Sequence, residues 1–210
     1  MLKHSLGLIL IILPLIVVCQ DTESGYRNQL KISVFRAINI LNPGFEISFE
    51  RFGGNKLSTQ LSAGIATNVM GKPFEKLHGY NIGLEEKYFV AKKNKSWKYI
   101  SLALNHSNTK YQETTSGVDP TTNLNIIDTF TIGRRSTSVA IKYGIQFYKN
   151  RFVWDLNLGA GLTYRTVKHY DRTFEYKEPR EAFDLHRAAN VERRGFAFHL
   201  PINIQLGYRF

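Results

Sequence analysis

The sequence predicts an all-β protein, an eight-stranded antiparallel up-and-down transmembrane β-barrel. Three observations predict it. Apolar residues recur at every second position in eight segments, short and long connections alternate along the chain, and the apolar faces carry more bulk than an eight-stranded interior can hold. Period-two alternation is the signature of strands whose two faces meet different surroundings. The predicted barrel domain is 29–210, after a signal peptide at 1–19 and a short segment at 20–28.

Length, charge and hydropathy limit the class of protein. The chain has 210 residues, which suits one domain, and its formal net charge is +11 at pH 7. A basic balance by itself favours an anionic partner such as lipid, polysaccharide or nucleic acid. The mean hydropathy is slightly negative. That value argues against a bundle of membrane helices, but not against a barrel whose strands average an apolar and a polar face.

The N-terminus reads as a secretory signal that is removed before folding. Its apolar run, Leu6–Val18, is shorter than the roughly 20 residues that a spanning helix needs. An uncleaved membrane anchor is the alternative, disfavoured by this length and by Pro14. Cleavage before Gln20 removes Cys19, the only cysteine, and lipidation of Cys19 is the other outcome. Export argues against a nucleic-acid partner and leaves the mature chain to be stabilised without disulfides.

Eight segments show the alternation. In the last one, every even position from Phe196 to Phe210 is large and apolar, and every odd position is small or polar. Two more are nearly as clear, 152–165 and 138–148. The other five, in chain order, are 29–38, 44–52, 56–69, 78–90 and 97–106.

The connections between these segments fall into two kinds. They are tight after the second, fourth and sixth strands and longer after the third, fifth and seventh, at about 70–77, 107–136 and 166–195. Transmembrane barrels show this asymmetry, with short turns at the periplasmic end and long loops at the other. An even number of strands also places both termini at the tight-turn end.

Volume decides which face of the strands points inward. The apolar faces supply roughly forty large side chains, whereas an eight-stranded barrel has room inside only for its own side chains or one small ligand. The apolar faces therefore cover the outside, which argues against a soluble lipid-binding barrel. Charges on the inner faces must be paired to be buried. The predicted lumen charge network is Glu46, Glu50, Glu85, Lys87, Lys142, Asp155, Arg165 and Arg209, with a catalytic or conducting role for these charges as the alternative.

Aromatic residues mark both ends of the predicted strands, as in the girdles of membrane barrels. Phe152, Trp154, Tyr208 and Phe210 fall at the tight-turn end, and Tyr164, Phe196 and Phe198 fall at the long-loop end.

Three residues disagree with a regular barrel. Arg36 and Glu86 fall on the lipid-facing parity, and we expect β-bulges to re-aim them. Pro201 cannot donate to a ladder, so it is expected near the outer rim, where water can replace the missing bond.

The chain resembles the small eight-stranded outer-membrane β-barrels of Gram-negative bacteria, of OmpA/OmpX-like architecture and Bacteroidota type. The residues that carry the resemblance are the leader 1–19, the alternating strands, the terminal "GYRF" and the opening "NPGFEISFERFGGNKLSTQLSAGIATN". The resemblance implies a location in the cell outer membrane and contact with its lipid and lipopolysaccharide. It also implies that Phe210 is the assembly signal, read by the barrel-assembly machinery. Such an architectural resemblance says little about function.

The sequence contains no recognisable catalytic, cofactor or metal motif. It therefore predicts a non-enzymatic protein without a cofactor, with a structural or adhesive role or a place in an envelope complex beside a protein partner. The alternative is a lipid-A-modifying enzyme. One such group uses a histidine and a serine two residues apart, whereas His106 and Ser107 are adjacent and point to opposite faces. Candidate surface contacts to phosphates or to a partner are Arg187, Arg193 and Arg194.

Overall fold

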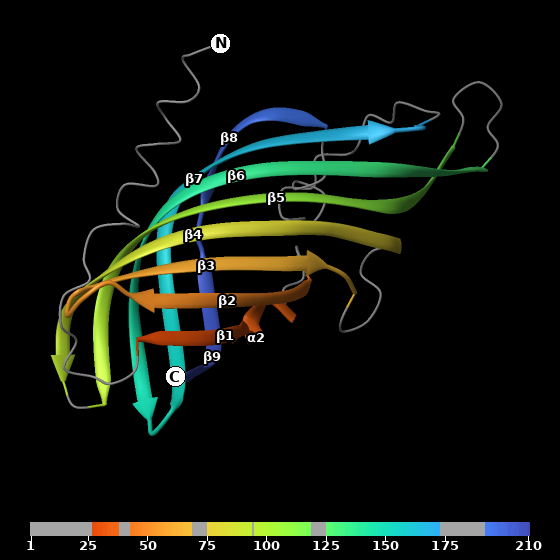
Figure 1. Cartoon of the computed structure of the whole chain (residues 1–210). Helices are drawn as coiled ribbons and strands as arrows, with labels where there is room; N and C mark the ends of the chain where they lie inside the picture. The colour runs from red at the N-terminus through yellow and green to blue at the C-terminus, as the bar shows by residue number, and fades with distance from the viewer. Residues whose placement is uncertain (1–26, 38–42, 69–74, 94, 119–124, 173–191) are drawn as a thin grey trace, which may run out of the picture.

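A computed structural model describes residues 27–37, 43–68, 75–93, 95–118, 125–172 and 192–210 (Figure 1). The predicted signal peptide at 1–19 and Arg187 lie outside these ranges. No helix among the described residues is long and apolar enough to cross a membrane. The elements in chain order are β1 (Asn28–Ser33), α2 (Val34–Ala37), β2 (Gly44–Phe52), β3 (Leu57–Ala66), β4 (Glu75–Lys93), β5 (Ser96–Val118), β6 (Asn125–Lys149), β7 (Phe152–Tyr170), β8 (Arg193–His199) and β9 (Ile202–Arg209).

The strands close into a ring. Consecutive strands from β1 to β7 pair antiparallel, and β9 pairs with both β7 and β1. β8 and β9 are two halves of one strand, because both pair with β7 in a single register, with Gly161 opposite His199 and Leu158 opposite Ile202. The chain is therefore an all-β antiparallel barrel with eight strands around the ring, and the predicted architecture is confirmed.

The stagger of the barrel is found by following residues that pair with one another from strand to strand, once around the ring. It is the number of residues between the start and the end of this row on the last strand. The row returns to the last strand at the level of Leu200, although it began at Phe210, so the offset is 210 − 200 = 10 residues. A stagger of this kind in eight strands tilts them by roughly 35–45° to the axis. The depth of a residue in the barrel therefore depends on its strand as well as on its place along that strand. The row runs Phe210, Asn28, Arg51, Thr59, Glu86, Leu102, Ile141, Ala160 and Leu200.

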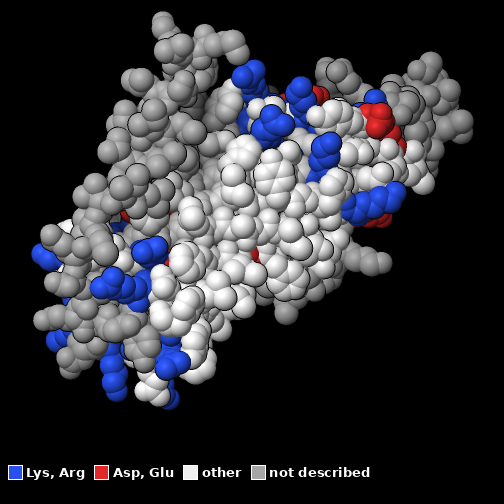
Figure 2. All heavy atoms as spheres, viewed as in Figure 1, with Lys and Arg blue, Asp and Glu red and all other residues white. Residues whose placement is uncertain are grey.

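The ring is apolar outside and polar inside. On β2, Phe45, Ile47 and Phe49 are 51%, 54% and 39% exposed, whereas Ser48 and Glu50 are 1% and 0% exposed. Figure 2 shows a broad surface almost free of charged side chains between two zones that carry lysine and arginine. This is the inverse of a soluble protein and matches the apolar band and polar interior of a membrane barrel.

Aromatic contacts lie at both edges of the apolar surface. Phe152 and Tyr208 meet edge to face at the tight-turn end, with ring centroids 5.9 Å apart. Tyr164 and Phe196 meet at the other end, with centroids 5.1 Å apart. These two pairs occupy the positions of the interfacial girdles in membrane barrels.

The predicted loop at 107–136 is wrong for most of its length, because β5 and β6 continue through it as one ladder to Val118 and Asn125. Polar residues interrupt both faces of this segment, so the long apolar period that marks a strand is lost. Hydroxyl pairs across the ladder hold it instead, Ser107 with Ser136 at 2.8 Å and Thr114 with Thr129 at 3.0 Å. The far ends of β4, β5, β6 and β7, beyond the apolar surface, form a sheet that we call the projection (Figure 1).

The predicted strand 29–38 is too long. β1 ends at Ser33, and the helical turn α2 follows it. The turn, rather than the expected β-bulge, re-aims Arg36, whose guanidinium reaches the Glu46 carboxylate at 3.2 Å.

The β-bulge expected at Glu86 is also absent from the described ladder. Glu86 pairs regularly with Thr59 and Leu102. The register shifts of β4 lie elsewhere, between Glu75 and His78 and between Phe89 and Ala91. Glu86 therefore stays on the lipid-facing side.

Pro201 lies between β8 and β9, nine residues before Phe210, which places it near the outer edge of an apolar band about 25 Å tall. The Gly159 N–H donates to the Pro201 carbonyl at 2.9 Å, and proline can return no bond. The outward apolar face continues beyond it to Phe198 and Phe196, which are 67% and 77% exposed. The proline removes one rung of the ladder without changing the register.

The close approach of β6 and β7 depends on glycine at position 161. A Cβ built there lies 2.1 Å from the Val139 carbonyl oxygen and 2.6 Å from Ala140 Cα. We expect Gly161→Ala to lower the free energy of unfolding by about 1–3 kcal/mol, the usual cost of overpacking, measured by urea unfolding in detergent micelles. Gly195→Ala is the control, since a Cβ there meets nothing within 4 Å. Equal stability of the two variants would contradict the expectation.

Candidate functional site

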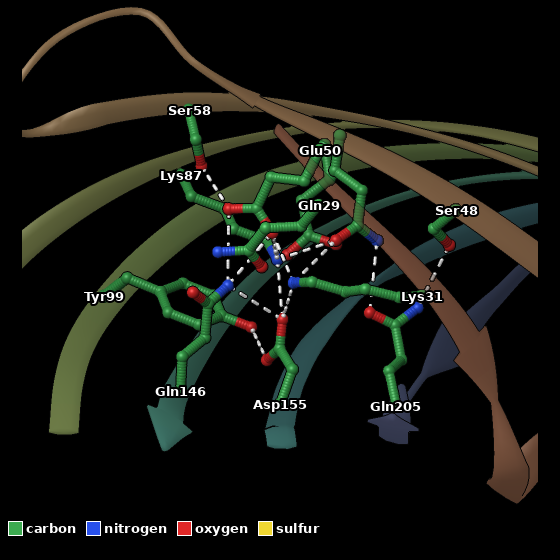
Figure 3. Close-up of polar contacts among 12 residues, drawn as sticks. Gln29, Lys31, Ser48, Glu50, Ser58, Lys87, Tyr99, Gln146, Asp155 and Gln205 are labelled. Carbon is green, nitrogen blue, oxygen red and sulfur yellow. Dashed lines mark hydrogen bonds and ion pairs between the residues drawn. The ribbon is translucent and has the colours of Figure 1, made fainter. Parts of the chain in front are cut away.

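Four fully buried charges lie together in the lumen and form what we call the four-charge cluster (Figure 3). The Lys87 ammonium lies 3.0 Å from the Glu50 carboxylate and 2.8 Å from that of Asp155. The Lys31 ammonium lies 2.5 Å from Asp155 and also pairs with Glu50. Two positive and two negative charges thus balance within hydrogen-bond distance, which is the condition for burying charge in a low-dielectric interior.

Neutral side chains complete the hydrogen bonding of the cluster. Ser58 and Tyr99 each donate a hydroxyl hydrogen to one carboxylate, at 2.5 and 2.6 Å. The Gln146 amide donates to both carboxylates at 3.0 Å, and the Gln60 oxygen accepts from both lysines at 2.8 and 3.3 Å. Gln205 on β9 accepts from Gln60 at 3.3 Å. Every strand around the ring therefore contributes a side chain, so the cluster braces the barrel across its diameter.

Two smaller polar groups lie in the lumen beyond the cluster, toward the long-loop end. Lys142 and Glu85 form an ion pair at 2.8 Å. Glu46 accepts from Asn81 at 2.6 Å and from Arg36 at 3.2 Å. The lumen is thus filled by paired groups at successive depths.

Aromatic side chains close the tight-turn end below the cluster. The Phe52 and Phe89 rings stack with centroids 5.5 Å apart. Two cations cover this group. The Lys92 ammonium lies 4.1 Å from the Trp97 ring centroid, and the Arg209 guanidinium lies 4.9 Å from the Tyr148 ring centroid. We call the five aromatic residues the aromatic plug: Phe52, Phe89, Trp97, Tyr99 and Tyr148.

Six of the eight residues of the predicted charge network form ion pairs, in three separate groups and not in one network. The Arg209 side chain lies at the tight-turn end, where its Nε donates to the Asn150 carbonyl at 2.8 Å. Arg165 forms no ion pair among the described residues, and its Nε is buried without a hydrogen-bond partner there. The six are Glu46, Glu50, Glu85, Lys87, Lys142 and Asp155.

Lys31 was not in the predicted charge network, although it makes two of the four ion-pair contacts in the cluster. Its signal was available, because Lys31 stands between Leu30 and Ile32 and so takes the inward parity of its strand. The glutamines at 60, 146 and 205 share that parity, but alternation alone does not say which inward residues meet.

His106 and Ser107 do not form a catalytic pair. His106 Nδ1 lies 2.9 Å from Thr137 Oγ1 on the outer face, whereas Ser107 Oγ meets Ser136 on the inner face. The described part of the chain also holds no group of three side chains placed to bind a metal ion.

The projection has a small core of its own. Ile132 and Val167 are buried against Tyr111 and Phe130 on its inner face. Burial raises the pKa of the Tyr111 hydroxyl to about 12, and the Arg134 guanidinium lies 5.9 Å from the Tyr111 ring centroid. The projection is therefore a packed sheet and does not depend on lipid for its apolar contacts.

Of the three predicted surface arginines, two lie in the described residues. Arg193 and Arg194 begin β8 at the long-loop end, where the Arg194 Nε donates to the Tyr164 hydroxyl. Arg194 has the outward parity of Phe196 and Phe198, and Arg193 has the opposite parity.

The closed ring, the apolar outer face and the ion-paired lumen together define a small membrane-spanning β-barrel protein. No protein-family model matches the chain, and no curated protein matches it. Two solved structures are similar to it. One is the N-terminal β-barrel domain of Pseudomonas aeruginosa OprF, at 13% identity and a TM-score of 0.41; the other is a major outer membrane protein from Thermus thermophilus, at 12% identity and a TM-score of 0.43. Each match covers 89% of this chain and 100% of the other.

Removing one member of the four-charge cluster leaves a buried charge without compensation. We expect Lys87→Met to lower the free energy of unfolding by about 3–5 kcal/mol, measured by urea unfolding in micelles with tryptophan fluorescence. The double variant Glu50→Gln with Lys87→Met should lose about 1–3 kcal/mol less than the sum of the single variants, because the two groups interact.

The control for this cycle is Lys98→Met, which removes an exposed lysine at the tight-turn end. Its effect should stay within about 0.5 kcal/mol. Strict additivity of Glu50→Gln and Lys87→Met would show that the two charges do not stabilise each other.

Proposed function

We propose that the protein is a non-enzymatic, non-conducting barrel of the cell outer membrane that holds the projection at the cell surface. Its role is structural or adhesive, in contact with an external or envelope partner. The observation that carries the proposal is the filled lumen. With the interior occupied by its own side chains, the part left to meet another molecule is the projection.

Two layers of side chains block the lumen in series. The side chains of Lys31, Glu50, Lys87 and Asp155 are all 0% exposed, and the aromatic plug lies below them. A passing solute would have to separate ion pairs that are balanced only while they stay together. This supports a barrel that anchors and does not transport.

The outer-membrane location is supported by the asymmetry of the connections and by the terminal Phe210, which by resemblance serves the barrel-assembly machinery. In that orientation the tight turns face the periplasm and the projection faces outward. Arg193 and Arg194 then lie at the level of lipopolysaccharide phosphates, which guanidinium groups bind in bidentate fashion.

The projection suits a contact surface. β5 and β6 run as one ladder of paired residues far beyond the apolar surface, and the core around Tyr111 and Ile132 keeps this sheet ordered outside the membrane. Rigid elements hold binding groups in place better than loops do.

Conductance measurements test the blocked lumen. Purified protein in planar bilayers should give no stable channels, because the four-charge cluster and the aromatic plug fill the interior. Insertion is verified by the heat-dependent shift of the folded barrel on a gel. Large, stable and reproducible channels would contradict the proposal.

Trimming the projection tests its role in contact. Residues 109–134 are replaced by a tight turn that joins Asn108 to Arg135, which face each other in the ladder. The trimmed barrel should still fold, since the cluster and the plug are intact, but cells that carry it should lose adhesion to host or abiotic surfaces or recovery of an envelope complex. Unchanged behaviour in all of these assays would contradict a contact role for the projection.

A further inference from the structure

Glu86 places a carboxyl group on the lipid-facing side of the barrel wall. Glu85 and Lys87 on either side of it are buried in the lumen, so Glu86 takes the outward parity. Its Oε1 accepts a hydrogen bond from Thr59 Oγ1 at 2.8 Å. Among the described residues this is its one hydrogen bond, and the side chain is only half-buried. We call these two residues the Thr59–Glu86 pair.

The stagger of the barrel sets the depth of this pair. In the row that begins at Phe210, Glu86 is reached after four of the eight steps, which is half of the ten-residue offset. Five residues of rise along tilted strands correspond to roughly 12 Å along the barrel axis. The apolar band of a membrane barrel is about 25 Å tall. Glu86 therefore lies near mid-depth, and its short side chain cannot reach the headgroups from there.

A carboxyl group at this depth is costly against lipid. Ionisable side chains inside membranes are rare and mark functional positions, and hydrocarbon offers them no hydrogen bonds. Thr59 satisfies one oxygen and fixes the orientation of the group. Among the described residues nothing bonds to the other oxygen, so it is open to a partner from outside this barrel.

We propose that the Thr59–Glu86 pair is the centre of an interface between two copies of this chain. The two Glu86 carboxyl groups, protonated, hydrogen-bond to each other across a two-fold axis parallel to the membrane normal. A protonated carboxyl group carries one donor and free acceptor sites, so it is complementary to itself. A two-fold interface brings the same patch of both copies together.

The membrane itself favours a second copy over a different partner. Both copies insert in the same orientation, so their Glu86 side chains lie at the same depth without further adjustment. A partner of different sequence would need a polar group at that one depth.

The surroundings of the pair permit close approach. Leu57, Leu61 and Leu102 flank it on the outer face and are 46%, 52% and 56% exposed. Arg51, which pairs with Thr59 in the ladder, is also exposed on this face. β2 and β3 are 9 and 10 residues long, whereas β5 and β6 of the projection have 23 and 25. The barrel wall at β2 and β3 thus lacks the long strands of the projection, which begin at the neighbouring β4 (Figure 1). The interface rests on the membrane placement in the proposed function, but not on the blocked lumen.

Thiol cross-linking in native membranes tests the position of the interface. Leu61→Cys, beside Thr59 on β3, should give a covalent dimer with a short bismaleimide. Leu158→Cys on β7, four strands away around the ring and 62% exposed, should stay monomeric. Equal cross-linking at both positions, or none at position 61, would overturn the proposal.

Sedimentation equilibrium in density-matched micelles tests the chemistry. Glu86→Leu should weaken dimerisation by about tenfold, the effect of losing one to two hydrogen bonds in an apolar medium. Glu86→Gln should keep most of it, because an amide can also pair with itself, and Thr59→Val should lie between the two. Both apolar variants suit a lipid-facing site, and their folding is verified by the heat-dependent gel shift. The proposal would be overturned if the wild-type protein stayed monomeric at every protein-to-detergent ratio. It would also be overturned if Glu86→Leu dimerised as strongly as the wild type. The conductance measurement tests the proposed function separately.

Discussion

A closed ladder is the constraint on which the rest of this structure depends. A bilayer offers no partner to an open backbone N–H or C=O group, so strands that cross it must pair all the way round. Eight strands with a ten-residue stagger enclose a space just wide enough for their own side chains. Closure therefore makes the interior narrow and leaves the outer face to carry the bulky apolar residues. The glycines at 159 and 161 belong to the same constraint, because the neighbouring strand passes too close for a side chain.

The narrow interior of the barrel is filled with polar side chains. Buried charges are tolerated only in balanced, hydrogen-bonded sets, and here two lysines meet two carboxylates among amide and hydroxyl groups from every strand. The aromatic plug below them needs no such balance, apart from the tyrosine hydroxyls that reach up to Asp155 and Gln146. The proposed block of the lumen and the stability of the barrel thus depend on one arrangement, since the side chains that brace the wall also occupy the interior.

The regions that depart from this arrangement are the ones that can meet other molecules. The projection has hydroxyl pairs across its ladder and a small core around Ile132. The Thr59–Glu86 pair keeps a carboxyl group on the outer wall near mid-depth. Neither feature helps the barrel to close or to fill its lumen, which is why both direct attention to partners outside the chain.

Period-two alternation by itself determined the all-β class, the number of strands, the tight turns and the inward side of Glu50, Lys87 and Asp155, because a strand shows its two faces locally. It did not find the far ends of β5 and β6, where polar residues interrupt the apolar period, nor the helical turn that brings Arg36 to Glu46. Only the tertiary structure decided that Lys31 joins the cluster while Arg165 and Arg209 do not, and that Glu86 lies at mid-depth. Those outcomes depend on register and stagger, which are properties of paired strands far apart in the sequence and are not written in any one of them.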